Sequence, residues 1–170
     1  WLTVERSGVL WCEVGDRVDL PAEQGRCRMF FGTYTPKLDE KGRLFLPAKF
    51  RDELTEGLVV TRGQERCLTV WSLEDFGRLT DRLREAPVTQ KNTRDYVRML
   101  FAAASQEVPD KQGRINIPAP LREYASLRKE CVVIGSMNRI EIWDPASWAS
   151  YSEEQEQKFS ELSDEVFPGI

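Results

Sequence analysis

The side chains best placed for chemistry lie in a short charged motif that occurs twice. Three residues of the first copy recur 71 residues later, and the equivalent pairs are Asp39 and Asp110, Gly42 and Gly113, and Arg43 and Arg114. In each copy the glycine allows the positive backbone angle of a tight turn. The aspartate can accept backbone amide hydrogens in that turn and can pair with the arginine. On residue types alone, a purely structural turn explains the motif as well as a ligand site does.

A second interpretation is that the turn presents cations to DNA. An arginine fork matches two acceptors of guanine, which provides about 1 to 3 kcal/mol of discrimination against the wrong base. Residues 36–49 have four cations against two acids, and these cations are the first candidate DNA contacts, Lys37, Lys41, Arg43 and Lys49. Residues 107–120 have two cations, Lys111 and Arg114, against two acids. We therefore expect the first motif to make the dominant DNA contacts and the second to be mainly structural or to assist.

The composition disfavours an enzyme and predicts neither catalytic residues nor a metal or cofactor site. The chain has 170 residues and no histidine, which is the commonest general base and metal ligand. It has no glycine-rich phosphate-binding motif, and its four cysteines form no Cys-x-x-Cys pair. The sequence predicts reduced thiols, with Cys67 and Cys131 as small apolar strand residues. With no hydrophobic run long enough to span a bilayer and no signal-peptide pattern, we expect a cytoplasmic protein that does not contact a membrane.

The motifs belong to longer repeats, which must position them. The ten residues from Asp39 match those from Asp110 at five positions, and similarity continues to Trp71 and Trp143. We predict five segments. They are an extension of unknown role (1–28), a first repeat (30–84), a linker with a connecting helix (85–104), a second repeat (102–151) and an acidic C-terminal segment (152–170). Two repeats are too few for a solenoid, so we expect one body with internal pseudo-twofold symmetry in which each repeat completes the other's core.

Each repeat predicts an α+β arrangement of short strands and helices. In the first repeat we expect strands over 32–35 and 43–46, a helix over 48–54, and a hairpin of strands over 58–61 and 67–71. Pro47 suits the first position of a helix, and Ser72 and Asp144 are expected N-caps of the two later helices.

Two further helices are predicted outside these elements. Asn92 is the expected N-cap of the connecting helix, whose apolar face is formed by Tyr96, Met99, Leu100 and Ala103. The acidic C-terminal segment reads as a partly exposed amphipathic helix with Phe159, Leu162 and Val166 on its apolar side. That side needs a partner, for which another subunit is one candidate.

The residues of both motifs resemble the MraZ family of bacterial transcriptional regulators. The similarity rests on Met29 to Gly32, on Leu38 to Leu44 with Pro47 and Arg51, and on Asp110 to Ile115 with Pro118. It implies a duplicated swapped-hairpin β-barrel of the AbrB-like type with peripheral helices. It further implies ring-shaped homo-oligomers that bind double-stranded DNA at short direct repeats, in the promoter of the protein's own division and cell wall gene cluster. The motif aspartates and arginines are expected to occupy the family's motif positions.

The resemblance leads to two expectations about function and leaves one alternative. The protein is expected to be a non-enzymatic regulator associated with the nucleoid. Because several identical loops of a ring act at high effective concentration, affinity should depend steeply on the number of DNA repeats. The alternative is an antitoxin-like DNA-binding protein with a protein partner, since the same hairpin fold serves in that class.

Overall fold

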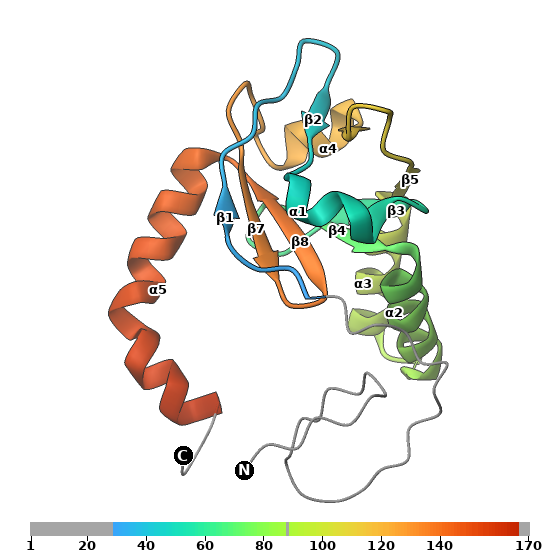
Figure 1. Cartoon of the computed structure of the whole chain (residues 1–170). Coiled ribbons are helices and arrows are strands. Elements are labelled where there is room, and N and C mark those ends of the chain that lie inside the picture. Colours follow the sequence, from blue (N-terminus) through green and yellow to red (C-terminus); the bar gives the residue numbers. More distant parts are fainter. Residues whose placement is uncertain (1–28, 88, 167–170) are drawn as a thin grey trace, which may run out of the picture.

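The computed structural model describes residues 29–87 and 89–166, with side chains through residue 159. The predicted extension over residues 1–28 and the side chains of Leu162 and Val166 lie outside this part. The described chain is an antiparallel sheet surrounded by helices (Figure 1), which confirms an α+β fold. The elements in chain order are β1 (Thr33–Tyr34), β2 (Arg43–Phe45), α1 (Ala48–Arg51), the 3-10 helix η1 (Asp52–Leu54), β3 (Leu58–Arg62), β4 (Leu68–Ser72), α2 (Leu73–Glu85), α3 (Lys91–Ala102), β5 (Ser105–Glu107), β6 (Arg114–Asn116), α4 (Ala119–Tyr124), β7 (Val132–Ser136), β8 (Arg139–Trp143) and α5 (Pro145–Val166).

The two repeats exchange strands. The six-stranded sheet has the order β1-β7-β8-β4-β3-β5, so β1 of the first repeat pairs with β7 of the second, and β5 of the second pairs with β3 of the first. The remaining two strands, β2 and β6, form a separate antiparallel ribbon with one strand from each repeat. Each repeat therefore depends on the other for its backbone hydrogen bonds. The closed barrel stays a prediction.

The register of the strands relates the repeats by a pseudo-twofold operation. Exchanging equivalent strands of the two repeats reverses the sheet order and leaves it otherwise unchanged. In the ribbon, Leu44 lies opposite its own equivalent Ile115. In the centre of the sheet, Thr69 of β4 lies opposite its equivalent Glu141 of β8. The pseudo-twofold axis therefore passes through these two pairs.

A single hydrophobic core joins the repeats. Strand residues alternate between the two faces of a sheet, and on β4 and β8 the core face carries Leu68, Val70, Ile140 and Ile142, all fully buried. Leu44 and Ile115 of the ribbon belong to the same cluster. The expectation that each repeat completes the other's core is confirmed.

The predicted helix starts are only partly correct. Ser72 caps α2, because its Oγ accepts the Asp75 backbone N–H at 3.1 Å. Asp144 likewise accepts the backbone N–H of Ser147 at 3.1 Å at the start of α5. Pro47 is the N-cap of α1 and not its first helical residue.

The connecting helix α3 differs from its prediction in two ways. It begins at Lys91 with Gln90 at the N-cap, so the expected cap residue Asn92 lies within the first turn. A Lys91 to Asp95 ion pair of 2.6 Å supports this earlier start. Of the predicted apolar face, Leu100 is buried, while Tyr96 and Met99 are about half exposed. Only the end of α3 packs on the sheet, where the Thr61 hydroxyl donates to the Leu100 carbonyl at 2.6 Å.

The helices lie at the periphery of the sheet. In Figure 1, α2 and α3 run side by side, and the rings of Phe76 and Phe101 are 5.5 Å apart between them. Helix α5 leaves the body on the other side, anchored by Trp148 and Tyr151 on the buried Trp143. Phe159 farther along α5 is exposed. No helix in residues 29–87 and 89–166 combines the length and apolar character needed to cross a bilayer.

Candidate nucleic-acid interface

The first charged motif is a tight turn organised by one carboxylate. Asp39 Oδ1 accepts the backbone N–H groups of Lys41 and Arg43, both at 2.9 Å. Its second oxygen, Oδ2, accepts Arg43 Nε at 2.7 Å. Gly42 closes the turn with φ of 78° and donates its N–H to the Asp39 carbonyl at 2.9 Å. The backbone hydrogen bond from Arg43, followed by the guanidinium itself, lowers the pKa of Asp39.

The second motif repeats this geometry. Asp110 Oδ1 accepts the N–H groups of Gln112 at 2.9 Å and Arg114 at 3.0 Å, and Oδ2 accepts Arg114 Nε at 2.7 Å. Gly113 again has a positive φ, of 74°. The hydrogen bond from the Arg114 side chain is the main reason why the pKa of Asp110 falls to about 2. In both copies the aspartate forms the turn and also holds the arginine, so the two interpretations of the sequence are compatible.

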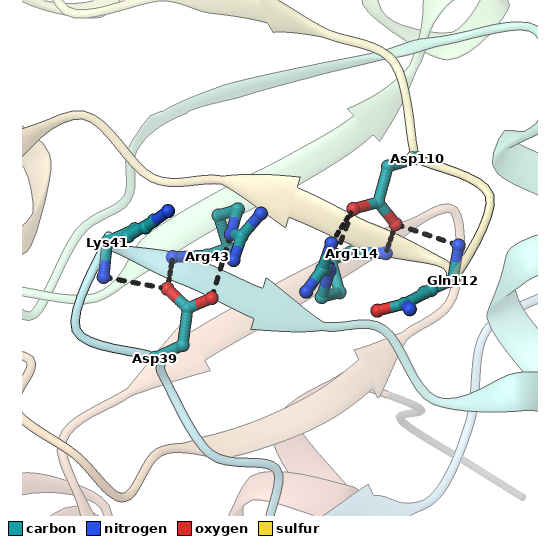
Figure 2. Close-up of polar contacts among 6 residues, drawn as sticks. All are labelled: Asp39, Lys41, Arg43, Asp110, Gln112 and Arg114. Atoms are coloured by element: carbon teal, nitrogen blue, oxygen red, sulfur yellow. Dashed lines mark hydrogen bonds and ion pairs between the residues drawn. The ribbon is translucent and has the colours of Figure 1, made fainter.

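The ribbon brings the two arginines to one face. Opposed residues of an antiparallel pair point to the same side of it. Leu44 and Ile115 face the core. The outward face is formed by their four neighbours, Arg43, Phe45, Arg114 and Asn116. Figure 2 shows both arginines between the two aspartates, with Lys41 and Gln112 in turns at opposite ends of the ribbon.

Backbone hydrogen bonds and close contacts from the other repeat hold each turn in place. Leu46 N–H donates to the Gly113 carbonyl at 2.9 Å, and Ile117 N–H donates to the Gly42 carbonyl at 2.8 Å. A side chain added at Gly113 would place its Cβ 2.4 Å from Nε of Arg51 in the first repeat. At Gly42 the same atom would lie 2.9 Å from Cζ of Arg122 in the second repeat. The glycines are therefore required both for their backbone angle and for the close approach of these arginines.

The two motif arginines differ in freedom. Arg43 is 33% exposed, and among the described residues its Nη groups have no hydrogen-bond partner. Arg114 is 19% exposed, and its Nη2 also lies 2.6 Å from Asp110 Oδ2. Its Cζ lies 5.7 Å from the centre of the Phe45 ring, a position that Asn116 cannot reproduce for Arg43. Arg43 is thus the more available of the two for a ligand.

The predicted lysines fall into two groups. Lys41 and Lys111 follow the aspartates in the two turns and are exposed at opposite ends of the ribbon. Lys37 and Lys49 are also exposed but lie outside the ribbon, Lys37 at a backbone bridge to Glu130 and Lys49 on α1. Among the candidate DNA contacts, the structure therefore brings the two arginines together on the ribbon. Lys41 and Lys111 flank them, whereas Lys37 and Lys49 lie outside the ribbon.

Three residues of the site were missed as candidates. Phe45 stands on the ribbon face beside Arg114, and Arg51 and Arg122 pack behind the opposite turns. The signal for the last two was available, since an arginine occurs at this position of both repeats. Arg51 Nε donates to the Leu46 carbonyl at 2.8 Å, whereas Arg122 Nε is buried without a partner among the described residues.

The other candidates have structural roles. Trp71 and Trp143 are buried, and Trp143 belongs to a small hydrophobic cluster with Cys67 and Val132. Cys67 and Cys131 are free buried thiols, but they lie immediately before β4 and β7, so the prediction that they are strand residues is wrong by one position. Burial raises the pKa of Cys67 to about 12. In the part of the chain that the structure describes, no cluster of three or more His, Cys, Asp or Glu side chains could hold a metal ion.

Comparison with known proteins gives consistent matches. A family model described as "MraZ protein" and antitoxin-like matches twice, over residues 29–99 and 100–168. A protein of Thermobifida fusca named "Transcriptional regulator MraZ" is 62% identical over 142 residues, which are 84% of this chain and 99% of that protein. Proteins of the same name from Frankia alni and Micrococcus luteus are 58% and 57% identical over the same shares of both chains.

Proposed function

The chain belongs to the MraZ family of transcriptional regulators, and from this premise we propose that it binds double-stranded DNA through the outward face of the β2–β6 ribbon. The observation that carries the proposal is the placement of Arg43 and Arg114 on one face, each held by an aspartate. A held arginine loses less conformational freedom when it forms hydrogen bonds to a base.

The shape of the ribbon suits the major groove. That groove of B-DNA admits a two-stranded β-ribbon, and its base edges offer guanine acceptors to arginine. Arg43 and Arg114 begin the two paired strands, and their side chains lie between the two aspartates, while Lys41 and Lys111 lie in the turns at the ends of the ribbon. We assign base contacts to the arginines and phosphate contacts to the lysines. Each phosphate neutralised is expected to steepen the salt dependence of binding by about 0.9 in slope.

The first motif is proposed to dominate. Residues 36–49 have a balance of two positive charges, whereas residues 107–120 are neutral. The greater exposure of Arg43, and the tighter hold on Arg114, support the same ranking. Lys37 and Lys49 then add phosphate contacts beside the ribbon on the side of the first repeat.

We propose that the protein regulates transcription from its own promoter in the bacterial nucleoid. The target is a set of short direct repeats ahead of its division and cell wall gene cluster, bound by a ring of identical subunits. Such a ring gains affinity because the second contact forms at high effective concentration. The exchange of β1 and β5 between repeats supports the AbrB-like swapped-hairpin barrel as the fold of each subunit.

The proposal is tested by gel shift with DNA from upstream of the gene and with scrambled DNA of the same composition. Wild-type protein should shift the upstream DNA preferentially, and Arg43→Ala should lose that preference. Arg84→Ala is the matched control, because this exposed arginine pairs with Asp81 on α2 and not with the ribbon. A preference that survives in Arg43→Ala would contradict the assignment.

The ranking of the motifs has its own test. Arg43→Ala should weaken binding more than Arg114→Ala in proteins with the same circular dichroism spectrum and oligomeric state. Equal losses would show that the two repeats contribute equally. Duplexes with one, two and three repeats should bind with steeply rising affinity, and equal binding to all three would contradict the ring.

A further inference from the structure

A cavity of about 440 Å³ lies on the face of the sheet opposite the core. On β4 and β8 this face carries the residues between the core positions, Thr69, Trp71, Arg139 and Glu141. Helix α3 covers one side through Tyr96, Met99 and Leu100. Arg62, the cross-strand partner of Leu68, and Tyr124 of α4 come from the core side and line the cavity at the end of the β3–β4 hairpin. Cavities of this size commonly accommodate small organic molecules.

The cavity is lined by polar groups without partners. Within the described residues, four buried side-chain polar atoms lack a hydrogen-bond partner, and three belong to residues that line this cavity, Arg62 Nε, Thr69 Oγ1 and Trp71 Nε1. Thr69 and Trp71 are only 7% and 8% exposed. Buried polar groups are nearly always hydrogen-bonded, because leaving one unpaired is costly. Three such groups around one cavity would suit a ligand that accepts hydrogen bonds.

The charged residues that line the cavity are Arg62, Glu65, Arg139 and Glu141. Both oxygens of Glu141 are engaged, since they accept Arg139 Nε at 3.0 Å and Trp143 Nε1 at 3.2 Å. Arg62 instead lies 4.9 Å from the centre of the Tyr124 ring, with no carboxylate partner among the described residues. Its guanidinium is therefore available for an anionic group.

Aromatic rings supply the apolar part of the site. Trp71 and Tyr96 line the cavity from the sheet and from α3, and Tyr96 is about half exposed. Planar rings pack favourably against such side chains. The same two residues and Arg139 also line a neighbouring hollow of about 360 Å³ between the sheet and α2, which extends the space available to a ligand.

We propose that this cavity binds a small molecule made of a planar ring and an acidic group, which is the chemistry of a nucleoside monophosphate. The ring packs against Trp71 and Tyr96. The acidic group accepts hydrogen bonds from Arg62 and from the unpaired donors on β4. The site is separate from the ribbon, so this proposal does not rest on the proposed DNA binding.

Calorimetric titration of the full chain tests the proposal directly. The probes are AMP, GMP, CMP and UMP, with adenosine as the probe that lacks the acidic group and inorganic phosphate as the one that lacks the ring. At least one nucleotide should saturate one site per chain and should bind more tightly than adenosine or phosphate. No saturable binding of any nucleotide, or equal binding of phosphate alone, would overturn the proposal.

Two threonines provide a matched pair of variants. Thr69 and Thr61 are cross-strand partners, but among the described residues only the Thr61 hydroxyl of the two has a hydrogen-bond partner, the Leu100 carbonyl at 2.6 Å. Thr69→Val removes an unpaired hydroxyl, so the melting temperature should stay the same or rise, while affinity falls by roughly tenfold. Thr61→Val breaks a hydrogen bond, so the melting temperature should fall while affinity is kept. Substitution of a threonine with a merely structural role would not lower nucleotide affinity while leaving the melting temperature unchanged.

Trp71→Phe gives a second variant at the same site. It removes the unpaired Nε1–H and keeps an aromatic wall, so nucleotide affinity should fall without loss of thermal stability. Unchanged affinity in both Thr69→Val and Trp71→Phe would overturn the assignment of the cavity.

Discussion

The Asp39→Asn substitution tests whether Asp39 orients the Arg43 guanidinium, because it leaves the charge of Arg43 unchanged. An asparagine Oδ1 can still accept the N–H groups of Lys41 and Arg43, which lie 2.9 Å from Oδ1 in the wild-type turn. The substitution removes the negative charge that holds Arg43 Nε at 2.7 Å. The turn should therefore survive while the guanidinium becomes free to rotate. We expect stronger binding to DNA in general and a weaker preference for the correct sequence.

The size of both effects follows from the contacts. If the freed guanidinium binds a phosphate, the salt dependence should steepen by about 0.9 in slope. Loss of an aimed arginine contact to guanine costs about 1 to 3 kcal/mol of discrimination, so the preference should fall roughly 5- to 150-fold. The carboxylate and guanidinium are 25% and 33% exposed, and exposed pairs contribute little to folding. The urea midpoint should therefore hardly change.

Fluorescence anisotropy with labelled promoter and scrambled duplexes measures both quantities in one series. Asp110→Asn is the matched control, because Asp110 makes the same contacts in the second motif, where we expect the smaller loss of preference. An unchanged preference in Asp39→Asn would refute the aiming role. A large fall in the urea midpoint would show instead that Asp39 acts mainly on folding.

Three further predictions concern the fold around the site. Gly113→Ala should destabilise by about 1 to 3 kcal/mol in urea unfolding, because its φ is 74° and its Cβ would meet Arg51. Gly77→Ala on α2, with open space around its Cβ, should instead stabilise slightly. Because the folded-state pKa of Asp110 is lowered to about 2, its charged form stabilises the fold at neutral pH, and this contribution should vanish as pH falls from about 4 to 2. The difference in urea midpoint between wild type and Asp110→Asn should then shrink at low pH, and a constant difference would contradict the ion pair. Cys67, with its pKa raised to about 12, should react with a thiol reagent at pH 8 only after unfolding, and rapid reaction of the native protein would show that it is accessible.

Local chemistry made part of this structure predictable. Gly42 and Gly113 take the positive backbone angles expected of the turns, and Ser72 caps α2, because these preferences act within a few residues. The wrong prediction of Asn92 as the N-cap of α3 also came from a local preference. Capping preference favoured Asn92, but α3 begins one residue earlier, at Lys91, with Gln90 at the N-cap and no side-chain capping hydrogen bond.

Long-range pairing was beyond local signals. Strands β2 and β6 are separated by a whole repeat, and nothing in either strand specifies that Phe45 will stand opposite Arg114. Arg51 and Arg122 were visible as a repeated arginine, yet their contact with the opposite glycine follows only from the exchange of strands. The residues of the motifs could thus be identified from the sequence. That Arg43 and Arg114 share one face of the β2–β6 ribbon became clear only from the three-dimensional structure.

The most direct test of the central claim is the ratio of dissociation constants for scrambled and promoter duplexes, measured with wild-type and Arg43→Ala protein at two salt concentrations. The ribbon interface predicts a wild-type ratio well above one at both concentrations, with both affinities falling as salt rises. In Arg43→Ala the ratio should approach one. A wild-type ratio of one, or a ratio unaffected by Arg43→Ala, would contradict sequence-specific DNA binding through this ribbon.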